Sequence, residues 1–307
     1  MKRTESTYNG VLIVNKPKEF TSFDVVAKLR GILHERRIGH GGTLDPMATG
    51  VLPVFVGGAT KAADLAAAQS KGYTAGFALG YATDTQDVTG TVTARSDKRA
   101  DTQTVRAAVG AMRGEQLQLP PMYSAIQVDG KRLYDLARKG ITVERKRRRI
   151  TLHECELLSF DEQNQCGVLR VVCSKGTYVR TLCNDLGEAL GTYATMTSLV
   201  RTSSGRYSLE QSYTLEQIEQ ATESGTVDAL FLQTDSLFAQ YPAVRLDDIG
   251  YQRMCNGAHI APEHAAGLPD TCGQLCRVYY NGLFYMLGRV DTLQRGGLAL
   301  FQEKRFR

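Results

Sequence analysis

The chain has 307 residues, of which 42% are hydrophobic and 22% are charged, a composition typical of a folded globular protein with a sizeable core. Its net charge of +5 only weakly indicates an anionic partner, so the location of the positive charge matters more than its sum. The first ten residues, MKRTESTYNG, lack the apolar stretch of a secretory signal, and no run of about eighteen apolar residues occurs, so we expect a cytoplasmic protein without a membrane span.

The seven cysteines are irregularly spaced and form no Cys-x-x-Cys pair. Cys272 and Cys276 lie four residues apart, but no second pair or histidine cluster completes a zinc site. We therefore expect reduced thiols and no metal site.

The first predicted element is a buried strand over residues 10–17, ended by its final proline. Thr21 and Asp24 then form a capping-box pattern, and apolar residues at helical spacing predict a helix that ends near His34. Lys16, by itself, is an ordinary strand-end lysine.

A glycine-rich segment, GHGGTLDPMATG, occupies residues 39–50. Glycine accepts positive φ and close approach, which predicts a tight loop that another molecule contacts. Asp45 precedes Pro46, which favours extended backbone, and a carboxylate held in this way can act as a nucleophile or a base. The segment lacks the Lys-Ser/Thr of a phosphate loop and the third glycine of a dinucleotide site. An ordinary structural turn stays open from these residues alone.

Strand, helix and strand are predicted next, over residues 51–56, 60–68 and 71–80. A polar turn, TDTQD, follows at residues 83–87. Tyr73 near the start of the second strand is, on residue type alone, a core or sheet-surface residue.

A helix capped by Asp101 or Thr102 is predicted to run to about Met112, followed by the proline-rich segment LPPMYSA. Residues 131–149 then contain nine basic and two acidic residues, a net charge of +7 that exceeds the +5 of the whole chain.

Charge runs are usually solvated surface, but a concentrated basic stripe is also the electrostatic footprint of nucleic-acid binding. Tyr123 and Tyr134 lie close to it in sequence and can stack on unpaired bases. The candidate RNA contacts are the five consecutive basic residues Arg145, Lys146, Arg147, Arg148 and Arg149.

A strand over residues 167–174 is predicted by its β-branched content, and a helix opens at residues 177–180 and ends at Gly191. Taken alone, Arg180 in this helix is a surface arginine. Residues 214–235 are predicted to be helical and polar.

The C-terminal part begins near Tyr241 and contains three strand-like runs, at residues 274–280, 283–290 and 298–306. The Asn-Gly pair between the first two runs indicates a tight hairpin. We expect a small barrel-like β domain.

Two segments, GHGGTLDPMATGVLPV and SKGTYVRTLCNDLG, resemble motifs of the bacterial tRNA pseudouridine-55 synthases, the TruB family. Four further features match the family in the same order along the chain: the Lys-Pro element, the tyrosine before Thr-Asp-Thr, the basic insertion and the motif RTSSGRY at residues 201–207. Asn15 departs from the family, in which many members carry Asp before Lys-Pro, so no pairing role is transferred to it.

The resemblance implies an α+β fold: a catalytic domain with a mixed central β-sheet over residues 1–235 and a PUA-like β domain over residues 240–307. The sequence match to the PUA-like domain is much weaker. The basic segment lies in an insertion, at about residues 120–150, that grips the RNA arm in the family.

The resemblance also implies site roles. Asp45 is the catalytic carboxylate, Arg180 is its partner, and Tyr73 stacks on the target base. An arginine beside a buried aspartate lowers the aspartate pKa by roughly 1–3 units, so we expect Asp45 to stay ionised. The further substrate-binding residues are His40, which fills the space of the flipped base, Tyr178 and Leu199 in the uracil pocket, Lys16 beside the site, and Asp87, which pairs with Arg180.

The implied function is isomerisation of uridine to pseudouridine at position 55 in the T-loop of tRNA, by base flipping and without a cofactor. We expect a monomer. Attack by Asp45 at C6 of the base, attack at C1′ of the sugar and a glycal route all stay open, and so does a local hydrogen-bonding role for His40. The alternative function is a non-catalytic RNA-binding or tRNA-folding protein on the same scaffold.

Overall fold

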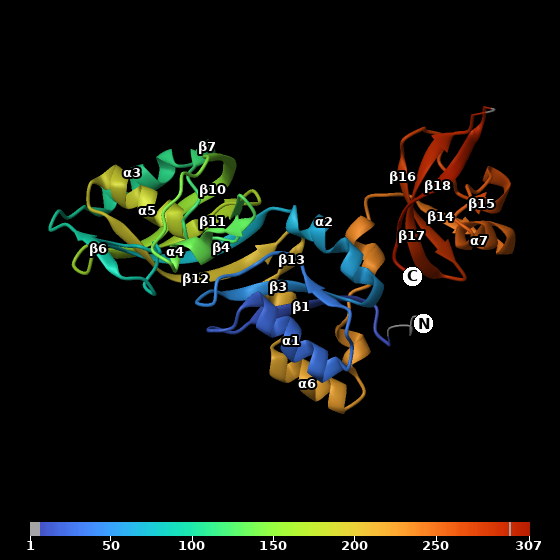
Figure 1. The fold of residues 1–307 in the computed structure, drawn as a ribbon, viewed down its shortest axis with the longest axis horizontal. Coiled ribbons are helices and arrows are strands. Elements are labelled where there is room, and N and C mark those ends of the chain that lie inside the picture. Colours follow the sequence, from blue (N-terminus) through green and yellow to red (C-terminus); the bar gives the residue numbers. More distant parts are fainter. Residues whose placement is uncertain (1–6, 295) are drawn as a thin grey trace.

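The computed structural model describes residues 7–294 and 296–307, so most of the N-terminal segment considered above lies outside the described residues. Within them the fold is α+β, with a nine-stranded and a five-stranded sheet (Figure 1). The expected fold class is confirmed.

The large sheet is mixed: its neighbouring strands are antiparallel except β3 and β12, which are parallel. Its order is β1 (Gly10–Lys16), β3 (Thr49–Val56), β12 (Ala194–Ser204), β4 (Lys71–Leu79), β11 (Cys166–Cys173), β10 (Arg148–Asp161) and β7 (Gly114–Gln118), with β2 (Ile38–His40) on β3 and β13 (Tyr207–Ser208) on β12.

Two helix pairs cover different halves of this sheet (Figure 1). Helices α1 (Ser22–Leu33) and α6 (Leu215–Glu223) pack on the β1 and β3 end. Helices α3 (Thr102–Ala111) and α5 (Val179–Leu190) pack on the half formed by β12, β4, β11 and β10. The smaller elements are α2 (Ala63–Ala67), α4 (Leu133–Ala137), β5 (Tyr81–Thr83), β6 (Val92–Arg95), β8 (Gln127–Val128) and β9 (Lys131–Arg132).

Strand β1 is a nearly continuous apolar run because both of its faces are buried. Leu12 and Val14 point into the core under α1 and α6. Val11 and Ile13 point to the other face, where they join Phe306 from the end of the chain. The alternation that marks a half-exposed strand is therefore missing here.

The two halves of the sheet meet at the short parallel pairing of Thr49 and Gly50 with Val200 and Arg201. Gly50 has φ of +102°, and a Cβ there would lie 2.3 Å from the carbonyl oxygen of Arg201. Only glycine permits this approach, because a side chain would collide with backbone. The loop that carries Asp45 ends directly before this join.

The five-stranded sheet and helix α7 (Asp248–Cys255) form the C-terminal β domain. The strand order is β15 (Ala265–Ala266), β14 (Ala243–Leu246), β16 (Leu275–Tyr280), β17 (Leu283–Thr292) and β18 (Leu298–Arg305). The predicted hairpin is confirmed: Asn281 and Gly282 both have positive φ. The ring centroids of Phe306 and Phe238 lie 5.4 Å apart, and Phe306 shares a core cluster with Val11 and Ile13 of β1, which attaches this domain to the large sheet. The last strand of the large sheet, β13, ends at Ser208, and the first strand of the second sheet, β14, begins at Ala243. The predicted boundary between domains 1–235 and 240–307 lies between these two strands, and it stays a prediction.

Some elements differ from expectation. Residues 60–68 form not one helix but a 3₁₀ turn, η1 (Gly57–Ala62), followed by the short α2, and the helical content of residues 214–235 is α6 plus two 3₁₀ turns, η3 (Val227–Leu230) and η4 (Thr234–Phe238). The sequence analysis did not identify β12 or most of β10. Strand β12 is rich in Thr and Ser, and it becomes a strand because it pairs with β4 along its length.

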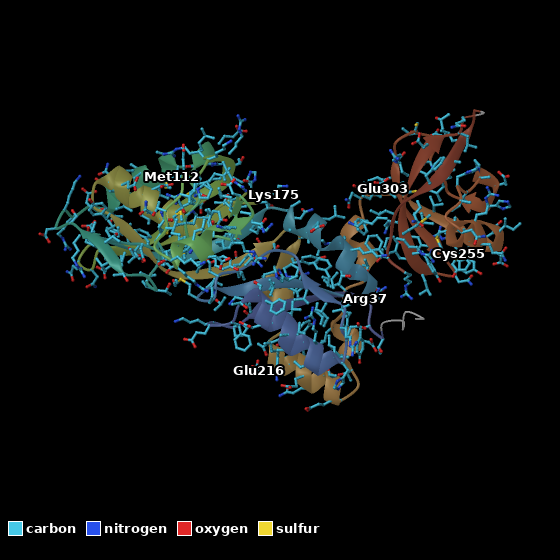
Figure 2. All side chains as sticks on the ribbon, viewed as in Figure 1. Arg37, Met112, Lys175, Glu216, Cys255 and Glu303 are labelled. Atoms are coloured by element: carbon cyan, nitrogen blue, oxygen red, sulfur yellow. The ribbon has the colours of Figure 1, made fainter. Side chains whose placement is uncertain are left out.

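All seven cysteines are free, and Cys255 is exposed on the C-terminal domain (Figure 2). No group of three or more His, Cys, Asp and Glu side chains suited to a metal ion occurs among the described residues. None of the helices in residues 7–294 and 296–307 combines the length and apolarity needed to cross a bilayer.

Candidate active site

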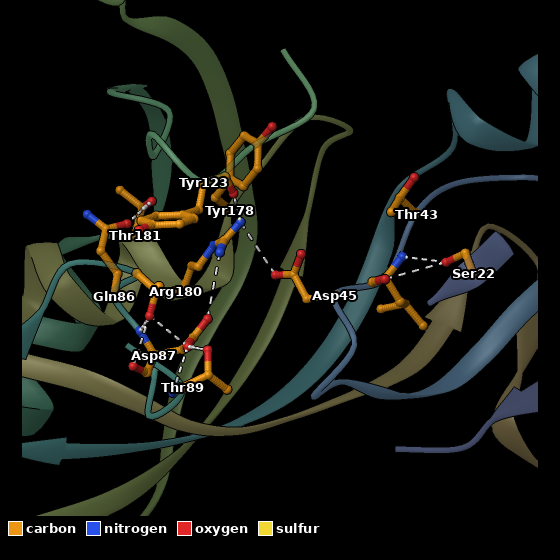
Figure 3. A network of polar contacts seen from close by, with 12 residues as sticks. Ser22, Thr43, Asp45, Gln86, Asp87, Thr89, Tyr123, Tyr178, Arg180 and Thr181 are labelled. Atoms are coloured by element: carbon orange, nitrogen blue, oxygen red, sulfur yellow. Dashed lines mark hydrogen bonds and ion pairs between the residues drawn. The ribbon is translucent and has the colours of Figure 1, made fainter. Parts of the chain in front are cut away.

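Asp45 lies in the loop between β2 and β3. The Ser22 hydroxyl accepts a hydrogen bond of 2.9 Å from the Leu44 amide, and the Ala48 amide donates to the Asp45 carbonyl at 3.0 Å. The backbone on both sides of the carboxylate is therefore fixed. The side chain is partly buried and points toward Arg180 on α5 (Figure 3).

Arg180 lies between two carboxylates (Figure 3). Its Nη2 is 3.6 Å from Asp45 Oδ2, and its Nη1 is 3.6 Å from Asp87 Oδ2. Nη2 also donates a hydrogen bond of 2.5 Å to the Tyr123 carbonyl. The arginine side chain is only 7% exposed, so these partners determine its orientation. The structure thus brings together three of the residues that the sequence analysis singled out.

Asp87 is the better anchored of the two carboxylates. Its Oδ1 accepts hydrogen bonds from the Thr85 hydroxyl at 2.8 Å, the Thr89 amide at 2.9 Å and the Thr89 hydroxyl at 2.5 Å. Because its second oxygen faces Arg180, Asp87 holds the guanidinium from one side and leaves the other side for Asp45. Asp45 has no comparable set of side-chain donors among the described residues, so it is the carboxylate that is free to react.

The pKa of Asp45 is raised above its ordinary value of 3.8. Burial is the largest cause and outweighs the lowering effect of Arg180, and the nearby Asp87 charge raises the pKa further. The expectation that Arg180 lowers the pKa of Asp45 was therefore wrong in its net direction, because it omitted desolvation and the second acid. A raised pKa makes the ionised carboxylate a stronger base and nucleophile.

Tyr73 and Leu199 lie on adjacent strands, β4 and β12, and are buried in the same core cluster as Leu44. Tyr73 pairs with Arg201 in strand register. Burial raises the pKa of its phenol, so the ring stays neutral. The loop of Asp45 thus borders the aromatic and aliphatic surface predicted to hold uracil.

Tyr178 lies immediately before α5. The Arg180 guanidinium carbon lies 5.8 Å from the centroid of its ring, within cation–π range. Burial raises the pKa of the Tyr178 hydroxyl. Tyr178 and Arg180 therefore form one side of the site, opposite Asp45 (Figure 3).

His40 ends β2, at the entry of the Asp45 loop. Burial lowers the pKa of its imidazole, so the ring is neutral at pH 7. Its Nδ1 is buried without a hydrogen-bond partner in the part of the chain that the structure describes. A neutral planar ring at this place suits contact with a base, and the predicted wedge role stays a prediction.

Lys16 is fully buried beneath the loop. Its Nζ donates to the carbonyls of Pro17 at 2.8 Å, Phe20 at 2.5 Å and Pro46 at 3.2 Å. Burial lowers its pKa to about 8. Because three carbonyls take up its three donors, Lys16 supports the backbone next to Asp45, and its predicted contact with substrate stays a prediction.

Arg201 is a site residue that the sequence analysis did not single out. It is fully buried, and its Nε donates to the Val51 carbonyl at 2.6 Å while Nη1 and Nη2 point to the carbonyls of Thr43 at 3.3 Å and Gly42 at 3.5 Å. Arg201 therefore holds the backbone of the glycine loop from the buried side. The signal in the sequence is that Arg201 opens the matched motif RTSSGRY, directly after the apolar pair Leu-Val.

The five residues of the basic segment lie at the edge of the large sheet, before and at the start of β10. Arg145 donates to the Pro120 carbonyl at 2.9 Å, and Arg147 donates to the Leu117 carbonyl at 3.1 Å. Arg149 pairs with Glu115 at 3.3 Å while staying 77% exposed. Apart from Arg145, which is half-buried, the segment is exposed.

Comparison with known proteins finds relatives that match most of the chain. Residues 30–179 match the TruB family pseudouridylate synthase N-terminal domain, and residues 180–239 match the tRNA pseudouridylate synthase B C-terminal domain. The tRNA pseudouridine synthase B of Lactiplantibacillus plantarum is 43% identical over 283 residues, which cover 90% of this chain and 92% of that protein. That of Bacillus cytotoxicus is 42% identical over 266 residues, which cover 85% and 87%.

Among solved structures, a Cbf5-Nop10-Gar1 complex contains a chain that superposes with a TM-score of 0.70 at 26% identity, over 97% of this chain and 85% of that one. The fold therefore agrees along nearly the whole length, including the C-terminal β domain. On the identity and coverage of these matches, the chain belongs to the TruB family of pseudouridylate synthases.

Proposed function

We propose that this protein isomerises uridine to pseudouridine in tRNA, at position 55 of the T-loop. The observation that carries the proposal is the Asp45–Arg180–Asp87 arrangement, found in a chain that is 43% identical over 283 residues to a tRNA pseudouridine synthase B. The position in the tRNA rests on the motif resemblance alone.

The reaction breaks the C1′–N1 bond, turns the uracil and joins C5 to C1′. The proton on C5 is released and N1 takes up a proton, so the composition of the nucleotide does not change. Asp45 is the group that meets the nucleoside. As a nucleophile it forms and then releases one covalent bond, at C6 or at C1′, and as a base in a glycal route it removes and returns one proton. Each route is redox-neutral.

Arg180 keeps the Asp45 carboxylate oriented, and Asp87 keeps Arg180 in place. Tyr73 stacks on the extruded base, while Tyr178 and Leu199 confine it so that the freed uracil rebinds through another atom. Flipping the uridine out of the RNA stack costs a few kcal/mol, and His40 fills the space that the base leaves.

The basic segment supplies the RNA contact. Its exposed arginines and lysine neutralise phosphates, and binding then weakens with salt as counterions are released. In this proposal the named residues carry out the isomerisation without a metal ion or an organic cofactor. We propose that a monomer carries out the reaction.

The buried charges favour an enzyme over a purely RNA-binding protein. Removing Asp45 and Arg180 from water costs free energy, and a binding scaffold gains nothing from a raised aspartate pKa beside a base pocket. The basic segment and the C-terminal domain would serve the rival function equally well.

Nucleoside analysis of a T-arm transcript after incubation with the protein tests the proposal. Pseudouridine is expected at position 55, and none is expected when that uridine is replaced by cytidine. RNA that is retained but yields no pseudouridine would support the rival binding function.

A further inference from the structure

Gln118, the last residue of β7, forms two hydrogen bonds with the backbone of a single residue, Tyr178. Its Nε2 donates to the Tyr178 carbonyl at 3.0 Å, and its Oε1 accepts from the Tyr178 amide at 2.8 Å. The residue is 2% exposed. A buried side-chain amide that uses both ends in this way fixes the position and the orientation of the peptide that it binds.

Tyr178 needs an external partner because of where it lies. It is the residue before α5, and it has no side-chain cap of its own. Its carbonyl also accepts the first helical hydrogen bond, from the Leu182 amide at 3.1 Å. The start of α5 therefore follows the position of Tyr178, and Arg180, two residues further on, moves with it.

The segment that follows Gln118 makes a second contact with the site. The Arg180 guanidinium donates to the carbonyl of Tyr123, five residues after Gln118. One short piece of chain, residues 118–123, thus holds both Tyr178 and Arg180 on the side of the site opposite Asp45 (Figure 3).

The basic segment contacts the backbone on both sides of Gln118. Arg148 pairs with Gln118 in the register of β7 and β10. Arg147 donates to the Leu117 carbonyl before Gln118, and Arg145 donates to the Pro120 carbonyl after it. Arg145 and Arg147, which are proposed to bind RNA, therefore hydrogen-bond the backbone on either side of Gln118.

We propose that Gln118 is a positioning residue for the isomerisation: it sets Tyr178 and Arg180 relative to Asp45 and links their placement to the basic segment. This inference rests on the proposed function. It adds a residue that never contacts the base, on a strand that the sequence motifs do not include.

The test compares Gln118→Ala with Gln116→Ala in the full-length protein. Gln116 lies on the same strand and also donates from Nε2 to a backbone carbonyl, that of Met112 at 3.0 Å. Because small misplacement of catalytic groups lowers rates steeply, kcat on a T-arm transcript is expected to fall about 10- to 100-fold for Gln118→Ala. KM is expected to stay within about twofold, and Gln116→Ala is expected to match the wild type.

Gln118→Glu provides a signature that a loss of stability does not mimic. The ionised carboxyl accepts from the Tyr178 amide but cannot donate to the Tyr178 carbonyl, whereas the protonated carboxyl does both, as glutamine does. The kcat of this variant relative to the wild type at the same pH is expected to rise as pH falls. The same ratio for Gln118→Ala is expected to be flat.

The outcomes separate the two proposals. A wild-type protein that forms no pseudouridine overturns the proposed function. An active wild type with Gln118→Ala within twofold in kcat, with equal losses for Gln116→Ala, or with a flat pH ratio for Gln118→Glu overturns the positioning role. If Gln118→Ala does not fold, the pH ratio of folded Gln118→Glu decides.

The link to the basic segment is tested by combining Gln118→Ala with Arg147→Ala. If Arg147 acts on kcat through Gln118, its substitution lowers kcat in the wild-type background and not in the Gln118→Ala background. Additive losses in kcat would overturn the link and leave the positioning role of Gln118 standing.

Discussion

Arginine performs different tasks in two regions of this molecule, the Asp45 site and the basic segment. Arg180 is 7% exposed and lies 3.6 Å from each of two carboxylates. Arg149 is 77% exposed, although its distance to Glu115 is a similar 3.3 Å. An ion pair in water contributes little, whereas a buried one resists rearrangement, so burial and not distance decides which arginine orients a reacting group. Substitutions in the two regions are expected to have different consequences.

The largest effect is expected at the centre of the site. Asp45→Asn removes the only group proposed to react, and kcat is expected to fall about 10³-fold or more. Retention of a T-arm transcript on a filter is expected to stay within about twofold, because the basic segment is untouched. Parallel loss of retention would assign Asp45 a structural role and erase the contrast between the regions.

Arg180→Lys is expected to lower kcat about 100-fold while KM changes little. A lysine ammonium cannot face Asp45 and Asp87 and reach the Tyr123 carbonyl together, because it lacks the planar fork of the guanidinium. Arg170→Lys is the matched control: Arg170 is 56% exposed and lies 3.4 Å from Glu154. Steady-state kinetics on the same transcript should show no change for the control, and a loss there of the same size would contradict the contrast.

A smaller effect, confined mostly to binding, is expected in the basic segment. Replacing Arg147, Arg148 and Arg149 by Ala is expected to weaken RNA binding about tenfold or more and to reduce the slope of log K against log salt by about 2. Lys28→Ala, an exposed lysine on α1, serves as the control with an unchanged slope. An unaltered slope in the triple variant would place the RNA elsewhere.

The smallest effect is a pH-dependent gain in stability for Asp45→Asn. The pKa of Asp45 in the folded state is raised above the unfolded value of 3.8. The free energy of unfolding of the wild type therefore decreases as pH rises from 3.8 to the raised pKa, and it stays lower at higher pH. Asp45→Asn lacks this decrease because asparagine does not ionise. Its Tm is expected to equal that of the wild type below pH 3.8 and to exceed it by up to a few degrees at neutral pH. Across the same window wild-type kcat should rise with pH, as Asp45 ionises.

Several elements could be predicted because their signals are local. Three of these signals depend on residues within four positions of one another: the cap of α1 by Thr21 and Asp24, the cap of α3 by Asp101 and the hairpin at Asn281. Strand β12 could not be predicted in this way. Its Thr- and Ser-rich sequence becomes a strand through pairing with a segment more than a hundred residues away.

The sequence by itself determined which chemical groups this protein carries: an aspartate in a glycine loop, an arginine at a helix start, tyrosines and a compact basic run. Tertiary structure decided their environment. It buried Asp45 and brought the charge of Asp87 near it, so that the Asp45 pKa rises, and it gave Lys16 and Arg201 the backbone carbonyls of the loop as partners. It also brought Gln118 to Tyr178. Burial and through-space distance set these interactions, and neither is encoded in the spacing of residues along the chain.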